Sequence, residues 1–214
     1  MSSMPCGSPR RSSFWSSMDK GFYHTALKGG EPSVEYPACS RAVFPGGVAI
    51  RHDITFGLHP EMGECQALYA DPPWPAGFEV FNERAQTPGG TWKGFMAKIG
   101  KIIAESKKPI FLTLGMRALG LLPGADNVFH LRLNHADVLL GVWNAPDVEV
   151  RGKCTAFRFL EMLVERYECI GDFCCGYGTT GRVFLGAGGK RVILTDYNAR
   201  CIGRIGQIAG DWKK

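Results

Sequence analysis

The chain has 214 residues, of which 45% are hydrophobic and 21% are charged. This size and composition suit a globular protein with one α/β domain and a sizeable core. No apolar run approaches the length of a membrane span, and no apolar segment follows Arg10 and Arg11, so we expect neither a membrane anchor nor a secretory signal. The net charge of +5 permits a phosphate-bearing partner without requiring one.

The eight cysteines favour a reduced, cytoplasmic protein. None belongs to a Cys-x-x-Cys pair, and the histidines have no spacing typical of metal ligands, so the sequence predicts no metal site. Several cysteines lie inside apolar runs, where a free thiol behaves as a small buried hydrophobe.

Residues 1–40 show little periodicity, and the first 20 residues are rich in serine. We expect residues 1–40 to form a flexible tail and a poorly patterned segment, and residues 41–214 to form a single domain.

Apolar runs and amphipathic segments alternate along the rest of the chain. Strands are predicted at 47–54, 65–70, 109–115, 168–173 and 191–196, two more strands within 127–144, and helices at 91–106, 154–167, about 179–187 and 198–210. Lys98 and Lys101 fall opposite the apolar stripe of the first helix, which is typical of a solvated face. The alternation predicts an α/β fold with a mostly parallel sheet, helices on both faces and one antiparallel hairpin. Ligands of such sheets bind beyond the carboxyl ends of the strands.

A glycine-rich turn, DFCCGYGTTG, links the strand ending near Asp172 to a helix. Glycines at this spacing let the backbone turn tightly and approach a ligand. Asp196 ends the next strand, where a carboxylate can accept hydrogen bonds from ribose hydroxyls. The turn lacks the Gly-Lys-Ser/Thr of a phosphate-binding loop, and Thr179 and Thr180 stand where a dinucleotide loop approaches pyrophosphate. S-adenosyl-L-methionine (SAM), which has a ribose and an adenine but no phosphate, is compatible with this pattern.

Residues 70–74, ADPPW, follow another predicted strand. DFCCGYGTTG resembles the SAM-binding motif of the amino-methyltransferases that modify exocyclic amines in nucleic acids, and ADPPW resembles their catalytic motif. The catalytic motif comes first, as in the permuted β-class DNA adenine methyltransferases, and the resemblance covers residues 47–210. It implies a Rossmann-like SAM methyltransferase fold with circularly permuted motif order, acting on DNA in a phage or restriction–modification setting. Trp74, where the DNA enzymes have tyrosine, also resembles the adenosine methyltransferases of messenger RNA, which leaves RNA open as the substrate.

The permuted order requires a strand from the N-terminal side beside the strand that ends at Asp196. The segment 47–54 fits this place, and Asp53 would then face the adenine of SAM. Lys153-Cys154 stands where the family has Lys-Pro. The cofactor-binding residues that the resemblance implies are Asp53, Lys153, Asp172, Cys174, Cys175, Gly176, Gly178, Thr179, Thr180 and Asp196. The two cysteines are expected to be pocket wall and not nucleophiles.

The expected chemistry assigns a role to each residue of Asp71-Pro72-Pro73-Trp74. An exocyclic amine is a poor nucleophile, because its lone pair is delocalised into the ring. The Asp71 carboxylate can accept one amine hydrogen and the Pro72 carbonyl the other, with the prolines fixing the direction of that carbonyl. Trp74 is expected to be exposed and to stack on a base that has left the helix. The transfer is direct, so positioning should supply much of the rate.

Two alternatives and the substrate contacts stay open at this stage. N4-cytosine methylation presents the same chemical problem, although aspartate and not serine at position 71 favours adenine. The chain could also be an inactive SAM-binding subunit that binds nucleic acid. The polar loops 76–95 and 144–153 are expected near the strand ends, the first of them mobile without substrate and helping to hold the base. Candidate phosphate contacts, with solvated surface as the default for each, are Lys107, Lys108, Lys190, Arg191, Arg200 and Arg204.

Overall fold

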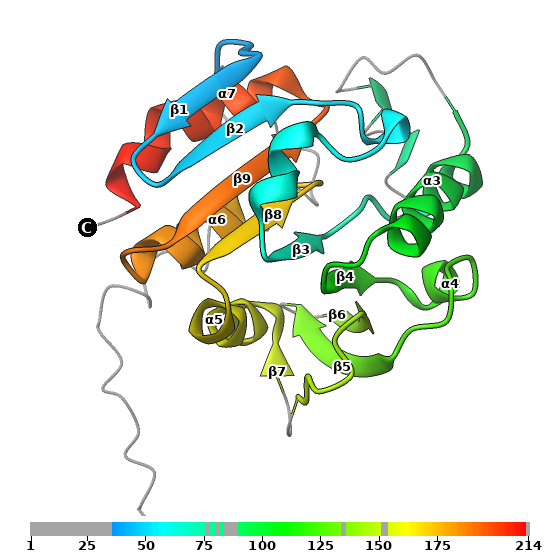
Figure 1. The fold of residues 1–214 in the computed structure, drawn as a ribbon. Helices are drawn as coiled ribbons and strands as arrows, with labels where there is room; N and C mark the ends of the chain where they lie inside the picture. The colour runs from blue at the N-terminus through cyan, green and yellow to red at the C-terminus, as the bar shows by residue number, and fades with distance from the viewer. Residues whose placement is uncertain are drawn as a thin grey trace, which may run out of the picture. The chain divides into compact units, whose positions relative to one another are not determined.

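The computed structural model describes residues 36–75, 78–79, 82–83, 90–133, 136–150 and 154–212. They form a nine-stranded sheet of order β1-β2-β9-β8-β3-β4-β6-β5-β7 (Figure 1). The strands are β1 (Arg41–Phe44), β2 (Gly47–Arg51), β3 (Ala67–Ala70), β4 (Ile110–Leu114), β5 (Asn127–Leu133), β6 (Ala136–Trp143), β7 (Cys154–Thr155), β8 (Cys169–Asp172) and β9 (Arg191–Asp196). The α-helices are α3 (Trp92–Glu105), α4 (Met116–Leu119), α5 (Ala156–Arg166), α6 (Thr179–Gly186) and α7 (Ala199–Ile208), and the 3-10 helices are η2 (Ile54–Phe56), η3 (Pro60–Glu64) and η4 (Ala209–Asp211).

The centre of the sheet is parallel. The parallel pairs are β2 with β9, β9 with β8, β8 with β3, β3 with β4, and, at the sheet edge, β5 with β7. The antiparallel pairs are β4 with β6 and the two hairpins β1–β2 and β5–β6. The prediction of an α/β fold with a mostly parallel sheet is therefore confirmed, and β5–β6 is the predicted antiparallel hairpin.

Strand β2 lies where the permuted motif order requires a strand. It pairs along its whole length with β9, and Arg51 stands beside Asp196 in the register. On the other side of β8 lies β3, so that two strands from the N-terminal half flank two strands from the C-terminal half. The carboxyl ends of β2, β9, β8 and β3 consequently meet at one edge of the sheet (Figure 1).

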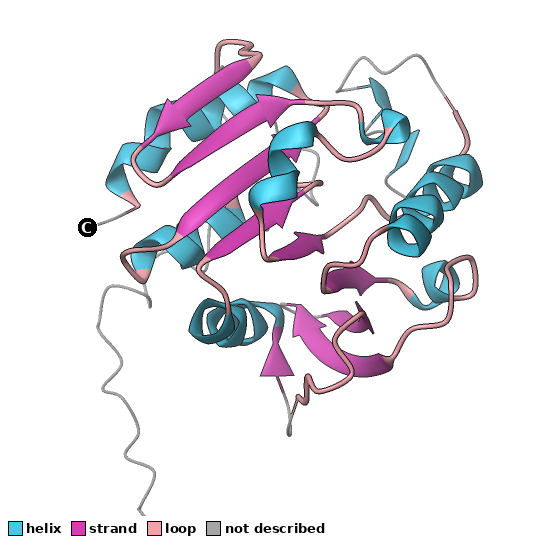
Figure 2. Ribbon diagram, viewed as in Figure 1, coloured by secondary structure: helices cyan, strands magenta, loops and turns pink. Residues whose placement is uncertain are grey.

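Helices cover both faces of this sheet (Figure 2). One face packs on α5, α6 and α7, and the other face packs on α3, η2 and η3. Strand β4 shows the division, because Phe111 enters the first cluster whereas Ile110 and Leu112 enter the second. All five residues of β4 are buried, as predicted for a strand covered on both sides.

Side-chain caps fix where the predicted helices begin. Thr91, Thr155 and Asn198 each accept a hydrogen bond from a backbone N–H in the first turn of α3, α5 and α7, respectively. Such caps satisfy donors that have no partner within the helix. Helix α5 starts at Ala156 and not at 154, because Cys154 and Thr155 pair with β5 as β7.

Three features differ from the sequence-based expectations. Strand β1 was not predicted, and it joins β2 through a tight turn in which Gly46 has a φ of 87°. The predicted strand 47–54 ends at Arg51, since Asp53 begins η2. The segment 144–150 follows Trp143, which pairs with Ile110 at the start of β4, so this segment lies at the sheet edge opposite the carboxyl ends of the parallel strands.

No helix within the described ranges is long and apolar enough to cross a membrane. The seven cysteines of these ranges are all free thiols. The proposed tail lies almost entirely outside the described residues, as do Cys6 and Lys153.

Candidate active site

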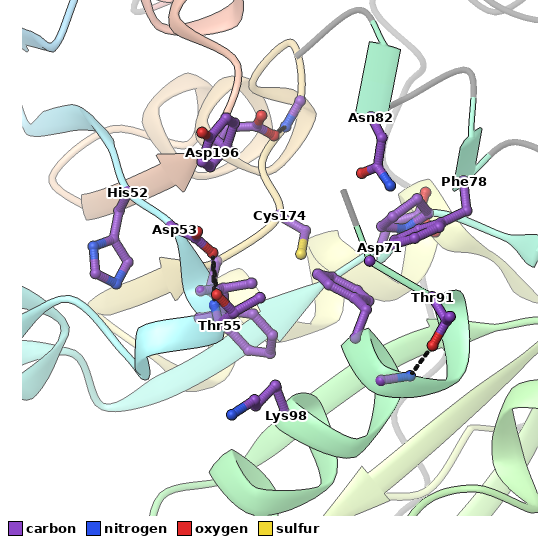
Figure 3. Close-up of a pocket in the computed structure, with 18 residues that line it drawn as sticks. His52, Asp53, Thr55, Asp71, Phe78, Asn82, Thr91, Lys98, Cys174 and Asp196 are labelled. Carbon is purple, nitrogen blue, oxygen red and sulfur yellow. Dashed lines mark hydrogen bonds between the residues drawn. The ribbon is translucent and has the colours of Figure 1, made fainter. Parts of the chain in front are cut away.

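A pocket of about 340 Å³ opens at the carboxyl ends of the parallel strands (Figure 3). Six of the predicted site residues line it: Asp53, Asp71, Pro73, Cys174, Gly176 and Asp196. These residues follow β2, β3, β8 and β9, which are far apart in the sequence and adjacent in the sheet. The structure therefore brings the ADPPW segment and the glycine-rich turn to one cavity.

Gly176 is the glycine of the turn that lines the pocket. Its φ is 49°, a conformation that side chains rarely adopt, and a Cβ built on it would meet no atom within 4 Å. Its N–H donates to Asp196 Oδ2 at 2.8 Å, while Asp196 Oδ1 accepts from the Asn198 N–H at 2.8 Å. Each carboxylate oxygen has a further lone pair, so Asp196 can still accept hydrogen bonds from a ligand.

Asp172 supports the turn from inside and does not line the pocket. Its Oδ1 accepts from the Cys174 N–H at 3.1 Å, and its Oδ2 accepts from the Thr180 hydroxyl at 2.6 Å. Asp172 and Thr180 are 3% and 1% exposed, so neither side chain reaches a ligand directly. In this structure Asp172 and Thr180 hold the turn, and their contact with the cofactor stays a prediction.

Of the remaining residues of the turn, Phe173 lines the pocket, whereas Cys175, Gly178, Thr179 and Gly181 do not. Cβ atoms built on Gly178 and Gly181 would lie 2.6 Å from the Trp212 ring, so both positions need glycine for close packing. Cys175 belongs to the buried core, and Thr179 starts α6. As with Asp172, none of Cys175, Gly178 or Thr179 is among the residues that line the pocket.

The ADPPW segment presents Asp71 and Pro73 to the pocket. The Pro73 carbonyl accepts a hydrogen bond from Trp92 Nε1 at 3.0 Å, which ties the segment to the start of α3. Pro72 is buried and does not line the pocket. The expectation of an exposed Trp74 is wrong: its side chain is half-buried and packs against the hydrophobic core.

Burial perturbs the acids around the pocket. The Asp71 side chain is exposed toward the cavity. The surrounding protein nevertheless shields its carboxyl from bulk water, and this burial raises the pKa of Asp71 to about 6. Hydrogen bonds from Thr113 and Trp74 lower the pKa and oppose this rise. Burial likewise raises the pKa of Asp172 to about 7 and the pKa of Asp196 above its usual range. No ion pair to these acids occurs among the described residues.

The two cysteines of the turn are protonated thiols. Burial raises the pKa of Cys174 and of Cys175 well above the usual range, and the neighbouring carboxylates add to this rise. Figure 3 shows the Cys174 sulfur directed into the pocket. The position of Cys174 agrees with the predicted wall residue, and the raised pKa of both thiols disfavours a thiolate nucleophile.

Asp53 lines the pocket and also holds the turn that carries it. Its Oδ1 accepts from both the N–H and the hydroxyl of Thr55, at 2.9 and 2.7 Å. His52 Nε2 lies 2.7 Å from the Gly57 carbonyl oxygen, which closes the same turn. Asp53 therefore sits at a fixed position on the β2 side of the cavity.

Several lining residues were missed by the sequence analysis. One of them is Tyr197, which follows Asp196. Arg51 donates a hydrogen bond to the Tyr197 carbonyl oxygen at 3.2 Å, and its guanidinium lies 5.1 Å from the centroid of the Tyr197 ring. Phe78 and Phe95 form a tilted ring pair with centroids 5.5 Å apart, and both line the pocket with Asp71. Figure 3 shows Phe78 near Asp71. The residues of the 76–95 segment that line the pocket are Phe78, Asn82, Gly90, Thr91, Gly94 and Phe95. Residues 76–77, 80–81 and 84–89 lie outside the described residues.

Lys98, expected on a solvated face, also lines the pocket. Four of the candidate phosphate contacts have other partners. Lys108 Nζ donates to the carbonyl oxygens of Gly63 and Cys65. Lys190 pairs with Glu168 at 2.7 Å and Arg191 with Glu64 at 3.0 Å, at the start of β9 and away from the cavity. Arg204 lies over two tyrosine rings.

Comparisons with known proteins return solved structures only. No protein-family model matches the chain, and no curated protein does. The crystal structure of the M1.HpyAVI–SAM complex gives a TM-score of 0.48 at 10% identity, covering 78% of this chain and 98% of that one. M1.HpyAVI alone gives 0.44 at 10% identity, with 74% and 95% covered. TTHA0409, a putative DNA modification methylase from Thermus thermophilus complexed with SAM, gives 0.42 at 9% identity, with 74% and 90% covered. Similarity of this extent carries no information on substrate or cofactor.

Proposed function

We propose that this chain is a SAM-dependent amino-methyltransferase that methylates N6 of an adenine in DNA. The observation that supports this most is the shared pocket of Asp71 and Pro73 with Gly176 and Asp196. A methyl donor and a base must meet for direct transfer, and the two motifs that resemble their binding sites open onto the same 340 Å³ cavity.

The residues of the turn fit SAM. The open space above Gly176 accepts a ligand that passes close to the backbone, and Asp196 beside it offers acceptors for ribose hydroxyls. Tyr197 and Asp53 line the same side of the cavity and suit the adenine. When bound, SAM would supply a methyl group on a sulfonium cation, which the unpaired charge of the surrounding acids favours.

Asp71 and Pro72 would prepare the amine of the substrate. Ionised Asp71 accepts one amine hydrogen, and the Pro72 carbonyl, which no hydrogen bond of the described residues engages, accepts the other. The hydrogen bond from Trp92 Nε1 to the Pro73 carbonyl would keep the ADPPW segment in place during the transfer. Fixed acceptors cost no reorganisation at the moment of reaction.

The base would lie against aromatic side chains near Asp71. Phe78 and Phe95 already line the cavity there, whereas Trp74 packs on the core next to Asp71. Phe78 and Trp74 are the two candidates for stacking on the base. Stacking of a flipped base on an aromatic ring contributes about 1–3 kcal/mol.

Sequencing that detects methylated bases tests the proposal. DNA from cells that express the chain should carry N6-methyladenine at a defined sequence, and DNA from cells that express Asp71→Ala should not. N4-methylcytosine in its place would assign the cytosine alternative, and methylation confined to RNA would assign the RNA alternative. A chain that binds SAM and methylates no nucleic acid would be the inactive subunit, which would refute the proposal.

A further inference from the structure

Thr113 is a buried polar residue beside the catalytic segment. It is 1% exposed and lies on β4, one residue after Leu112, which pairs with Ala70 in the parallel register. Asp71 follows Ala70, so Thr113 is the cross-strand neighbour of Asp71 at the point where β3 ends. Adjacent strands lie about 4.8 Å apart, which places the Thr113 side chain next to that of Asp71.

The Thr113 hydroxyl has two hydrogen-bond partners, the Ala70 carbonyl oxygen and the Tyr69 hydroxyl. Its Oγ1 donates to the Ala70 carbonyl oxygen at 3.3 Å, a long bond, and lies 3.0 Å from the Tyr69 hydroxyl. A hydroxyl has one hydrogen and two lone pairs, so when Thr113 donates toward the strand end, Tyr69 must donate to Thr113. The result is a buried chain from Tyr69 through Thr113 to the strand end that carries Asp71.

We propose that Thr113, oriented by Tyr69, is a positioning residue that holds the Asp71 carboxylate in its reactive orientation and in its ionised form. The inference rests on the proposed function, because Asp71 is the group through which Thr113 acts. Rotation of the Thr113 hydroxyl would direct its hydrogen from the Ala70 carbonyl to the Asp71 carboxylate. Hydrogen bonding by Thr113 is the strongest influence that lowers the pKa of Asp71, against the larger effect of burial.

The test is Thr113→Val, which keeps the shape and removes the hydroxyl. We expect kcat near pH 6.5 to fall by about tenfold, the equivalent of one hydrogen bond to a charged group, with the KM for SAM changed less than about twofold. The acidic limb of the pH profile of kcat should move to higher pH, since the protonated form of Asp71 is no longer opposed. Thr113→Ser should restore both the rate and the profile, and Tyr69→Phe should give a smaller shift in the same direction.

Thr195→Val is a matched control. Thr195 is 0% exposed at the end of β9, and its hydroxyl has no hydrogen-bond partner among the described residues. This variant makes the same substitution in the same kind of environment, and it should leave the pH profile unchanged. The carboxyl ¹³C shift of Asp71, followed by NMR against pH, gives a readout that does not depend on activity, and Thr113→Val should raise the titration midpoint.

The outcomes separate the two proposals. A wild-type chain that transfers no methyl group to DNA or RNA would refute the proposed function. An active wild type whose Thr113→Val variant keeps the profile and the Asp71 midpoint would overturn the role of Thr113 alone. So would a loss that Thr113→Ser fails to restore, or one that lies only in the KM for SAM.

Discussion

The hydrogen bond from Thr180 to Asp172 is expected to hold the glycine-rich turn in shape. It is 2.6 Å long, and both side chains are buried. Thr180→Val preserves the shape of the side chain and removes the donor. A hydrogen bond to a charged group contributes about 1.5–3 kcal/mol, so the variant should lose about 2 kcal/mol of unfolding free energy where Asp172 is ionised.

The loss should depend on pH, because Asp172 titrates near neutrality. Burial raises the pKa of Asp172 to about 7, and the bonds from Thr180 and the Cys174 N–H oppose that rise. Without the Thr180 hydroxyl the pKa rises further, so the native variant holds its proton to higher pH than the wild type does. Well below the pKa both proteins carry a protonated Asp172, and the deficit shrinks to that of a neutral bond, about 1 kcal/mol. Above it the full deficit appears.

Urea unfolding at about pH 5.5 and about pH 8.5 measures this difference. At the higher pH the melting temperature should fall by roughly 4–8 °C for a domain of this size. Thr179→Val, at the neighbouring half-buried position, is the control and should show no such dependence on pH. Equal losses for Thr180→Val at both pH values would refute the reasoning that Asp172 is an ionised acceptor in the folded chain.

Three further predictions concern the pocket and its turn. The acidic limb of kcat/KM should lie near pH 6, because activity needs ionised Asp71 and is lost as the pH falls through its raised pKa of about 6; a limb near pH 4 would mean that Asp71 is not the group required. In urea unfolding, Gly178→Ala should destabilise the chain by about 1–3 kcal/mol more than Gly188→Ala does. Both glycines have positive φ, but only at Gly178 would the new Cβ lie 2.6 Å from Trp212. Equal losses would contradict the packing role of Gly178. In thermal-shift measurements SAM should stabilise the chain more than its thioether product does, because only SAM carries a positive charge on sulfur. The difference should shrink at low pH as Asp71 and Asp196 become protonated. A difference that does not change with pH would exclude the carboxylates as its cause.

The sheet could be predicted because its signals are local or follow from motif order. The apolar runs gave the central strands, and the placement of the strand 47–54 beside the one ending at Asp196 is confirmed by the pairing of β2 with β9. Strand β1 was missed, although Pro45-Gly46 between two apolar runs is a hairpin signal that could have found it.

The site was harder to predict, because periodicity does not distinguish a cavity from bulk solvent. Thr91, Gly94, Phe95 and Lys98 share one face of α3 at spacings of three and four residues, and that face lines the pocket. The sequence assigned Lys98 to solvent on the same pattern. Contacts between distant segments, such as the bond from Trp92 to the Pro73 carbonyl, leave no mark in the sequence.

The glycine-rich turn shows a second limit of sequence reasoning. The sequence predicted cofactor contacts at seven residues of the turn: Asp172, Cys174, Cys175, Gly176, Gly178, Thr179 and Thr180. In the structure Gly176 faces the pocket, whereas Gly178 and Gly181 face Trp212. Trp212 is more than 30 positions away, so only the folded chain shows which glycines serve a ligand and which serve packing.

The most direct test of the account is methyl transfer by the purified chain. Unmethylated DNA is incubated with labelled SAM, digested to nucleosides and analysed by mass spectrometry, with Asp71→Ala as the variant, because it removes both acceptor oxygens of the side chain. We predict label in N6-methyldeoxyadenosine for the wild type, none for Asp71→Ala, and SAM bound by both. Transfer by Asp71→Ala at the wild-type rate, or a SAM-bound wild type that labels neither DNA nor RNA, would contradict this assignment.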